Sequence, residues 1–131
     1  MTESPEGIAN ADQIYALPGL DGIFVGPNDL KTQMTKTLPG GRKPTPEEFE
    51  SAVDQVLAAG KRTGCPVGIH TFSIEECKAR IAQGHQFMAY LSDVGILNAE
   101  SAKAVQALGI IRGSTSASGE GNSGVGGLGV Y

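Results

Sequence analysis

Two carboxylates, Glu3 and Asp29, are the residues of this sequence best suited to chemistry. Asp29 follows the apolar run of residues 23–25 and the dipeptide Gly26-Pro27, and Glu3 lies in a segment that could be the end of a truncated strand. Such an apolar run is typical of a short buried strand, which Gly-Pro would end. Loops after parallel strands converge on one crevice. Two carboxylates there, with water and an oxygen-rich substrate, suit a hard divalent cation such as Mg2+ or Mn2+.

Each of these residues also has an ordinary structural explanation. Asn28 or Asp29 could cap a helix by accepting hydrogen bonds from its free backbone N–H groups. Glu3 could be a solvated carboxylate near the start of the chain. His70 ends a predicted strand and could face the same edge as a catalytic base, although a single histidine there is more often structural. The residues alone leave these alternatives open.

Other positions contribute less to a site. His85 is expected on the surface, and Asp93 follows the third predicted strand and would point towards the same edge. Cys65 and Cys77 fit neither a disulfide framework nor a zinc site, so both are expected to be buried thiols. The glycines at positions 119, 121 and 124 have the spacing of a dinucleotide-binding fingerprint, but no predicted strand precedes them, so we attribute them to chance.

The elements that would position the site alternate between strands and helices. Strands are predicted over residues 21–25, 66–70 and 87–91, and helices over about 10–17, 46–61, 74–83 and 98–108, with a long loop over 31–44 that could begin with one helical turn. The helix over 46–61 begins with a capping box of Thr45 and Glu48 and has an apolar face that should pack on a sheet. The alternation predicts parallel strands with right-handed crossovers, and therefore an α/β fold.

Composition narrows the class of protein further. The chain has 131 residues, of which 40% are hydrophobic and 18% charged, so one core is expected. A formal net charge of -4 without a Lys or Arg cluster argues against nucleic acid and an anionic membrane surface as partners. No apolar run is long enough to span a membrane, and the first residues lack the pattern of a secretory signal, so a cytoplasmic protein is expected. Residues 113–131 are rich in Gly and Ser and are predicted to form a disordered tail.

Four segments of the sequence resemble the HpcH/HpaI aldolase family, and the resemblance covers about residues 3–108. They are Glu3-Ser4-Pro5-Glu6-Gly7, residues 8–14, Pro18 to Leu30 with Gly26-Pro27-Asn28-Asp29-Leu30 at its end, and residues 92–97. The resemblance implies a TIM barrel and a metal-dependent (class II) pyruvate aldolase acting on 4-hydroxy-2-oxo acids. By the same resemblance Glu3 and Asp29 would bind the metal, which would be Mg2+, Mn2+ or Co2+.

The resemblance also implies roles for the neighbours of these ligands. Gly26, Pro27, Asn28 and Asp29 would line the substrate, with Asn28 against the oxo acid and backbone N–H groups holding its carboxylate. Met1 would take the place of a substrate-contacting family residue, and Asp93 would have a structural or substrate-loop role. A bound metal would chelate the 2-oxo carboxylate and stabilise the enolate formed by retro-aldol cleavage.

A complete barrel takes about 250 residues, so residues 1–112 would form a half barrel with strands five to eight. The general-base histidine and the enolate-stabilising arginine of the family would come from the other half. We therefore expect either part of an aldolase or a non-catalytic assembly module, and in both cases a homo-oligomer or a complementary N-terminal half as partner. A relative of the citrate-lyase β-subunit is a third possibility, but no CoA-thioester contacts were found.

Overall fold

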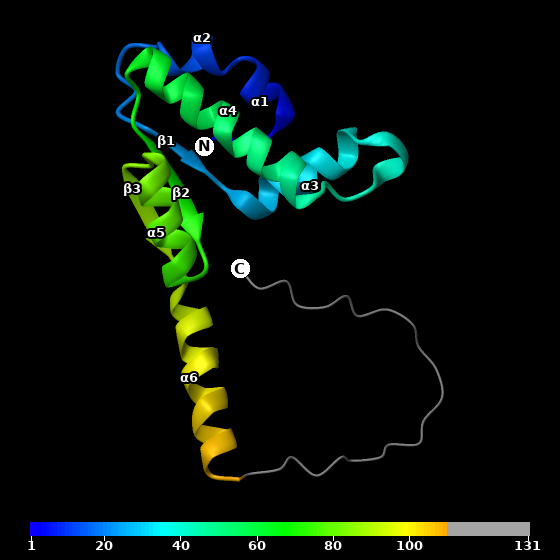
Figure 1. Cartoon of the computed structure of the whole chain (residues 1–131), viewed down its shortest axis with the longest axis vertical. Helices are drawn as coiled ribbons and strands as arrows, with labels where there is room; N and C mark the ends of the chain where they lie inside the picture. Colours follow the sequence, from blue (N-terminus) through cyan, green and yellow to red (C-terminus); the bar gives the residue numbers. More distant parts are fainter. Residues whose placement is uncertain (110–131) are drawn as a thin grey trace. The chain divides into compact units, whose positions relative to one another are not determined.

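The structure is a computed structural model that describes residues 1–109 (Figure 1). The chain forms two compact units, residues 1–91 and a second unit that begins at Ser92. The first unit contains the helices α1 (Pro5–Ala9), α2 (Ala11–Tyr15), α3 (Pro27–Thr37), α4 (Pro46–Thr63) and α5 (Ile74–Gln83), a 3-10 turn η1 (Pro39–Gly41), and the strands β1 (Ile23–Val25), β2 (Val67–Thr71) and β3 (Phe87–Tyr90). In the second unit lies α6 (Asp93–Ala107).

The three strands form one parallel sheet in the order β1-β2-β3. Val25 pairs with Ile69, and Ile69 with Met88, so these side chains lie on one face of the sheet. At the outer edge of β1, Thr2 forms an isolated parallel bridge with Val25. The predicted α/β class with parallel strands is confirmed.

One face of the sheet packs against α4 and forms the core. The hydrophobic sheet residues buried on this face are Ile23, Val25, Val67 and Ile69, and the buried α4 residues include Phe49, Ala52, Val53, Val56 and Leu57. The apolar face predicted for this helix is therefore confirmed. Local signals also fix its ends, because Thr45 and Glu48 form the predicted capping box and Gly64 closes the helix in a left-handed conformation.

An ion pair between buried Arg80 and half-exposed Glu50 joins α4 to α5. Arg80 is 5% exposed, and its guanidinium donates two hydrogen bonds to the Glu50 carboxylate, at 2.6 and 2.7 Å. The guanidinium lowers the pKa of the Glu50 carboxyl through these hydrogen bonds. Such bidentate geometry compensates for part of the cost of burying a charge.

At the N-terminal side of the chain, the helix predicted after Asn10 is present as α2, although it ends at Tyr15 rather than near Leu17. The short helix α1 that precedes Asn10 was not predicted. The Asn10 side chain donates to the Glu6 carbonyl at 2.9 Å and makes no side-chain cap for α2, so the predicted capping box with Gln13 does not form. Ser4 caps α1 instead by accepting from the Gly7 N–H.

The loop predicted over 31–44 is wrong in its first part, where one helical turn at most was expected, because α3 extends through Thr37. Leu30 and Met34 lie one helical turn apart and are both buried, so tertiary packing stabilises a helix whose sequence is largely polar. In the second unit, α6 begins at Asp93 rather than near 98, because Ser92 caps it by accepting from the Gly95 N–H.

The predictions for the cysteines, for His85 and for the C-terminal residues have different outcomes. Cys65 is buried and Cys77 is half-buried. His85 is 4% exposed, so the surface position expected for it is wrong. The boundary predicted at residue 112 and the tail over 113–131 lie outside the described residues. No helix in the described part of the chain is long and apolar enough to cross a membrane.

Candidate metal and oxo-acid site

Backbone contacts on both sides of Glu3 hold it beside the end of β1. The Thr2 N–H donates to the Phe24 carbonyl at 2.9 Å, which places the chain parallel to the strand. Ser4 then caps α1, so the chain turns into a helix directly after Glu3. Glu3 is half-buried between these two fixed positions.

The Glu3 carboxylate lies against Gly26, the residue that follows β1. A Cβ atom added to Gly26 would lie 2.5 Å from Glu3 Oε1 and 3.2 Å from its carboxyl carbon. Gly26 has φ -96° and ψ 99°, which any residue can adopt. Glycine is therefore not needed here for its backbone conformation. Its missing side chain makes room for the Glu3 carboxylate.

Asp29 lies in the first turn of α3, the helix that begins directly after Gly26. Gly26 is the N-cap of this helix, Gly26 and Pro27 are buried, and Asn28 and Asp29 are exposed. Asn28 and Asp29 therefore occupy the second and third helical positions rather than the capping position that was an alternative for them. Backbone N–H groups and the helix dipole favour negative charge at such a terminus.

The donor chemistry of this pair fits a hard divalent cation. Glu3 and Asp29 offer carboxylate oxygens, and Mg2+ is commonly bound by one or two carboxylates together with water and substrate oxygens. The missing Cβ at Gly26 leaves the space that the Glu3 carboxylate occupies. Within residues 1–109 no group of three or more His, Cys, Asp and Glu side chains could hold a metal ion, so a soft, fully protein-coordinated site is not formed there.

His70 lies near the C-terminal end of β2, and its imidazole is hydrogen-bonded. Its Nε2 lies 2.8 Å from the Leu91 carbonyl oxygen, and its ring contacts that of Phe72 with centroids 4.6 Å apart. Since a carbonyl only accepts, Nε2 carries the proton. This bond gives His70 a structural partner in the strand-end region.

Asp93 belongs to the second unit and begins α6. Its Oδ1 accepts from the Val94 N–H at 2.8 Å, which is a local interaction of the first helical turn. The predicted structural role for Asp93 is compatible with this contact.

Sequence reasoning missed one contact beside the site. The hydroxyl of Tyr15 lies 2.7 Å from Thr2 Oγ1, and both residues are buried. Thr and Tyr separated by a helix and a loop form no recognisable motif, so only the fold reveals this pair.

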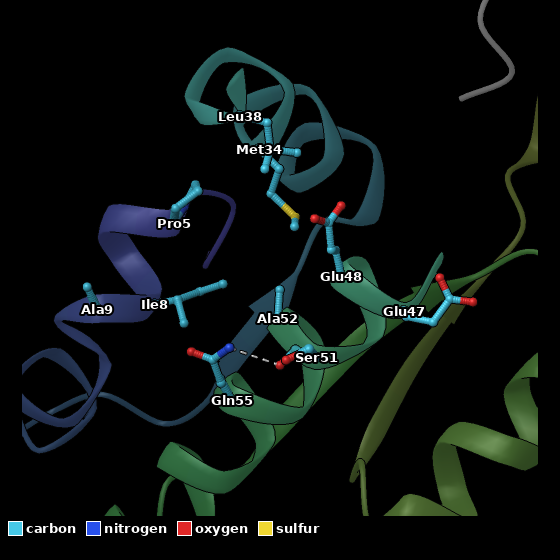
Figure 2. Close-up of a pocket in the computed structure, with 10 residues that line it drawn as sticks. All are labelled: Pro5, Ile8, Ala9, Met34, Leu38, Glu47, Glu48, Ser51, Ala52 and Gln55. Carbon is cyan, nitrogen blue, oxygen red and sulfur yellow. Dashed lines mark hydrogen bonds between the residues drawn. The ribbon is translucent and has the colours of Figure 1, made fainter. Parts of the chain in front are cut away.

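A further pocket lies away from the carboxylate pair. It has a volume of about 510 Å3 and is bounded by α1, α3 and α4, as Figure 2 shows. Its lining is Pro5, Ile8, Ala9, Met34, Leu38, Glu47, Glu48, Ser51, Ala52 and Gln55. Neither Glu3 nor Asp29 lines it, and Glu48 is engaged by Arg42 at 2.6 Å. The pocket is therefore separate from the carboxylate pair.

Comparisons with known proteins agree on one family. The model of the HpcH/HpaI aldolase/citrate lyase family matches residues 1–109. A hydroxypyruvate/pyruvate aldolase of Rhizorhabdus wittichii is 29% identical over 113 residues, covering 80% of this chain and 41% of that protein. A 5-keto-4-deoxy-D-glucarate aldolase of Citrobacter koseri is 32% identical over 105 residues, covering 80% of this chain and 39% of that protein.

A solved structure gives the same result at the level of the fold. The HpcH/HpaI aldolase/citrate lyase family protein of Burkholderia cenocepacia superimposes with a TM-score of 0.68 at 32% identity, over 82% of this chain and 40% of that one. The chain thus spans about two fifths of the length of the relatives it matches.

Proposed function

Since the chain belongs to the HpcH/HpaI aldolase/citrate lyase family, we propose that it supplies the metal- and oxo-acid-binding part of a carbon–carbon lyase. The substrates would be 4-hydroxy-2-oxo acids, cleaved to pyruvate and an aldehyde. The observation that carries this proposal is the contact between the Glu3 carboxylate and Gly26, the residue that follows β1. Asp29 lies in the first turn of α3, which begins directly after Gly26. The aldolase names of two relatives support the reaction class.

In this proposal the residues of the chain bind and orient. Glu3 and Asp29 would hold the divalent cation, which would supply charge stabilisation for an oxygen of the substrate that becomes negative. The residues from Gly26 to Asp29 border the 2-oxo acid, and the N-terminus of α3 favours its carboxylate. Pro27 contributes no N–H, so the backbone donors of this turn begin at Asn28.

The rest of the active site would come from outside the described part of the chain. We infer a partial TIM barrel, in which β1, β2 and β3 correspond to strands six to eight. The segment that contains Thr2 would correspond to the end of strand five. The parallel order of the strands and the bridge between Thr2 and Val25 support this assignment. A complementary N-terminal half, or other copies in a homo-oligomer, would supply the general base and the arginine.

Calorimetric titration with Mn2+ tests the proposal directly. We expect Glu3→Gln and Asp29→Asn each to weaken Mn2+ binding by about tenfold or more, because each removes a charged ligand. Asp21→Asn is the matched control, since Asp21 is exposed and precedes β1 at the other end of the strand. Affinity that is unchanged in both site variants, or reduced equally in the control, would refute the metal site.

A non-catalytic assembly module is a second candidate, favoured by the uncovered face of the sheet. Phe24 and Phe87 stack with centroids 5.8 Å apart on the face that does not meet α4, and Phe87 is 43% exposed. A Cβ at Gly68 would overlap the Phe87 ring, so this glycine makes room for it. Such a face needs a partner. Sedimentation showing stable association without any Mn2+ affinity would favour this second function.

A further inference from the structure

Tyr15 and Thr2 form a buried hydrogen bond directly before the candidate ligand Glu3. Tyr15 is 3% exposed and Thr2 is 5% exposed, and their hydroxyl oxygens are 2.7 Å apart. Burial raises the pKa of the Tyr15 phenol, so the hydroxyl keeps its proton near neutral pH. Two buried hydroxyls that bond each other are satisfied together, and losing one leaves the other without this partner.

This bond adds a side-chain restraint to the backbone contacts that already hold this segment. The Thr2 N–H donates to the Phe24 carbonyl at 2.9 Å, and Thr2 forms the isolated bridge with Val25. The Thr2 side chain is held by α2 through Tyr15, and α2 is packed on α4. Because Glu3 is the next residue, rotation of Thr2 would move the Glu3 carboxylate away from Gly26.

We propose that Tyr15 is a positioning residue that fixes the Glu3 carboxylate against Gly26 by holding Thr2. This inference rests on the proposed function where it concerns metal binding, but the Glu3–Gly26 contact itself does not depend on a metal. Tyr15 touches neither substrate nor metal in this role. Its ring belongs to the core, and only its hydroxyl acts on the site.

The variants Tyr15→Phe and Thr2→Val each remove the hydrogen bond while keeping the shape of the side chain. We expect each to weaken Mn2+ binding by about tenfold, the lower end of the range for groups that orient metal ligands. The double variant should be no weaker than the worse single one, since both remove the same bond. Thr2→Ser keeps the hydroxyl and should retain the affinity of the unchanged chain.

A second readout follows the position of Glu3 without metal. The Gly26 amide signal in a 1H–15N spectrum should differ from that of the unchanged chain in Glu3→Gln, because the carboxylate lies against Gly26. It should also differ in Tyr15→Phe and in Thr2→Val if these changes move Glu3. Asp12→Asn is the control, because it removes a different side-chain interaction of α2, the exposed ion pair with Arg62, and should change neither readout.

The two readouts separate failure of this inference from failure of the proposed function. If Glu3→Gln and Asp29→Asn weaken Mn2+ binding but Tyr15→Phe and Thr2→Val leave both affinity and the Gly26 signal unchanged, the positioning role is overturned and the metal site stands. If no variant alters Mn2+ affinity but the Gly26 signal moves in Tyr15→Phe, the metal site fails and the positioning of Glu3 stands. If Tyr15→Phe does not fold, Thr2→Val decides.

Discussion

His70 donates its Nε2–H to the carbonyl oxygen of Leu91 at 2.8 Å, which ties the end of β2 to the residue that follows β3. Leu91 has φ 53°, a left-handed conformation that is unusual for a leucine. Its N–H donates to the Thr71 carbonyl at 3.0 Å. The left-handed conformation costs a leucine about 1–2 kcal/mol of conformational free energy. The two hydrogen bonds help to offset this cost.

Replacing His70 by Phe should therefore destabilise the fold. The ring contact with Phe72 can persist, whereas the hydrogen bond is lost, so the free energy of unfolding should fall by about 1 kcal/mol. Urea denaturation followed by circular dichroism measures this change. Adding Leu91→Gly should recover part of the loss, because glycine adopts the left-handed conformation without strain. Equal stability of His70→Phe and the unchanged chain would mean that the bond contributes nothing.

Gly26→Ala should reduce Mn2+ affinity with little effect on folding. The backbone conformation accepts alanine, and the atom that a Cβ would meet at 2.5 Å is the tip of the flexible Glu3 side chain. Moving the Glu3 carboxylate should weaken Mn2+ binding by about tenfold, and the melting temperature should stay close to that of the unchanged chain.

A thermodynamic cycle with Glu3→Ala gives the control for this prediction. Once the Glu3 carboxylate is gone, Gly26→Ala should have no further effect on affinity, because the two changes act through one contact. Additive losses would show that Gly26→Ala acts by another route.

Stability should decrease as the pH falls from 7 to 5 because His85 is buried. Its Nδ1 lies 3.2 Å from the Arg80 carbonyl, and its Nε2 has no hydrogen-bond partner among the described residues. Burial lowers the pKa of His85 below its ordinary value, with a smaller contribution from the Arg80 charge, while Asp54 and the Arg80 carbonyl oppose the shift. The unfolded chain therefore binds a proton first, and the folded state loses stability below about pH 6.5.

Thermal melts of the unchanged chain and of His85→Gln between pH 7 and 5 test this expectation. The melting temperature of the unchanged chain should fall more steeply than that of the variant over this range, because only the former gains a proton at position 85 on unfolding. Parallel curves would assign the pH dependence to other groups.

Gly60→Ala should destabilise the core although alanine favours helices. A Cβ at Gly60 would lie 2.7 Å from the Cys65 carbonyl oxygen and would overlap a methyl group of Val67. Overpacking of this kind costs about 1–3 kcal/mol, which exceeds the gain of about 1 kcal/mol in helix propensity. Ser51→Ala, at an exposed position of the same helix, should change the free energy of unfolding by less than about 0.5 kcal/mol in the same urea titration.

Local signals predicted the part of the fold that depends on neighbours in sequence. The capping box of Thr45 and Glu48 and the apolar spacing of α4 both act within a few residues, and the structure has them as predicted. The helix α3 was missed because its stability comes from burying Leu30 and Met34 against other segments. Its threonines and lysines alone resemble a loop.

The same distinction applies to the candidate site. Asp29 could be selected from the sequence because it follows a strand and a Gly-Pro turn. The contact between Glu3 and Gly26 and the bond between Thr2 and Tyr15 join segments that only the folded chain brings together. The sequence does not reveal the burial of His85. The left-handed conformation of Gly84 reverses the chain at the end of α5, and the His85 ring then lies against the Arg80 carbonyl.

The ion pair between Glu50 and Arg80 has a consequence for how this sequence can diverge. Arg80 is buried and its main carboxylate partner comes from a different helix, so losing Glu50 alone leaves a buried guanidinium with only Glu76 nearby, at 3.9 Å. Losing Arg80 alone leaves a Glu50 carboxylate that is 45% exposed and that water can solvate. The order of the two changes therefore matters, and position 50 should keep a carboxylate in relatives in which position 80 keeps an arginine.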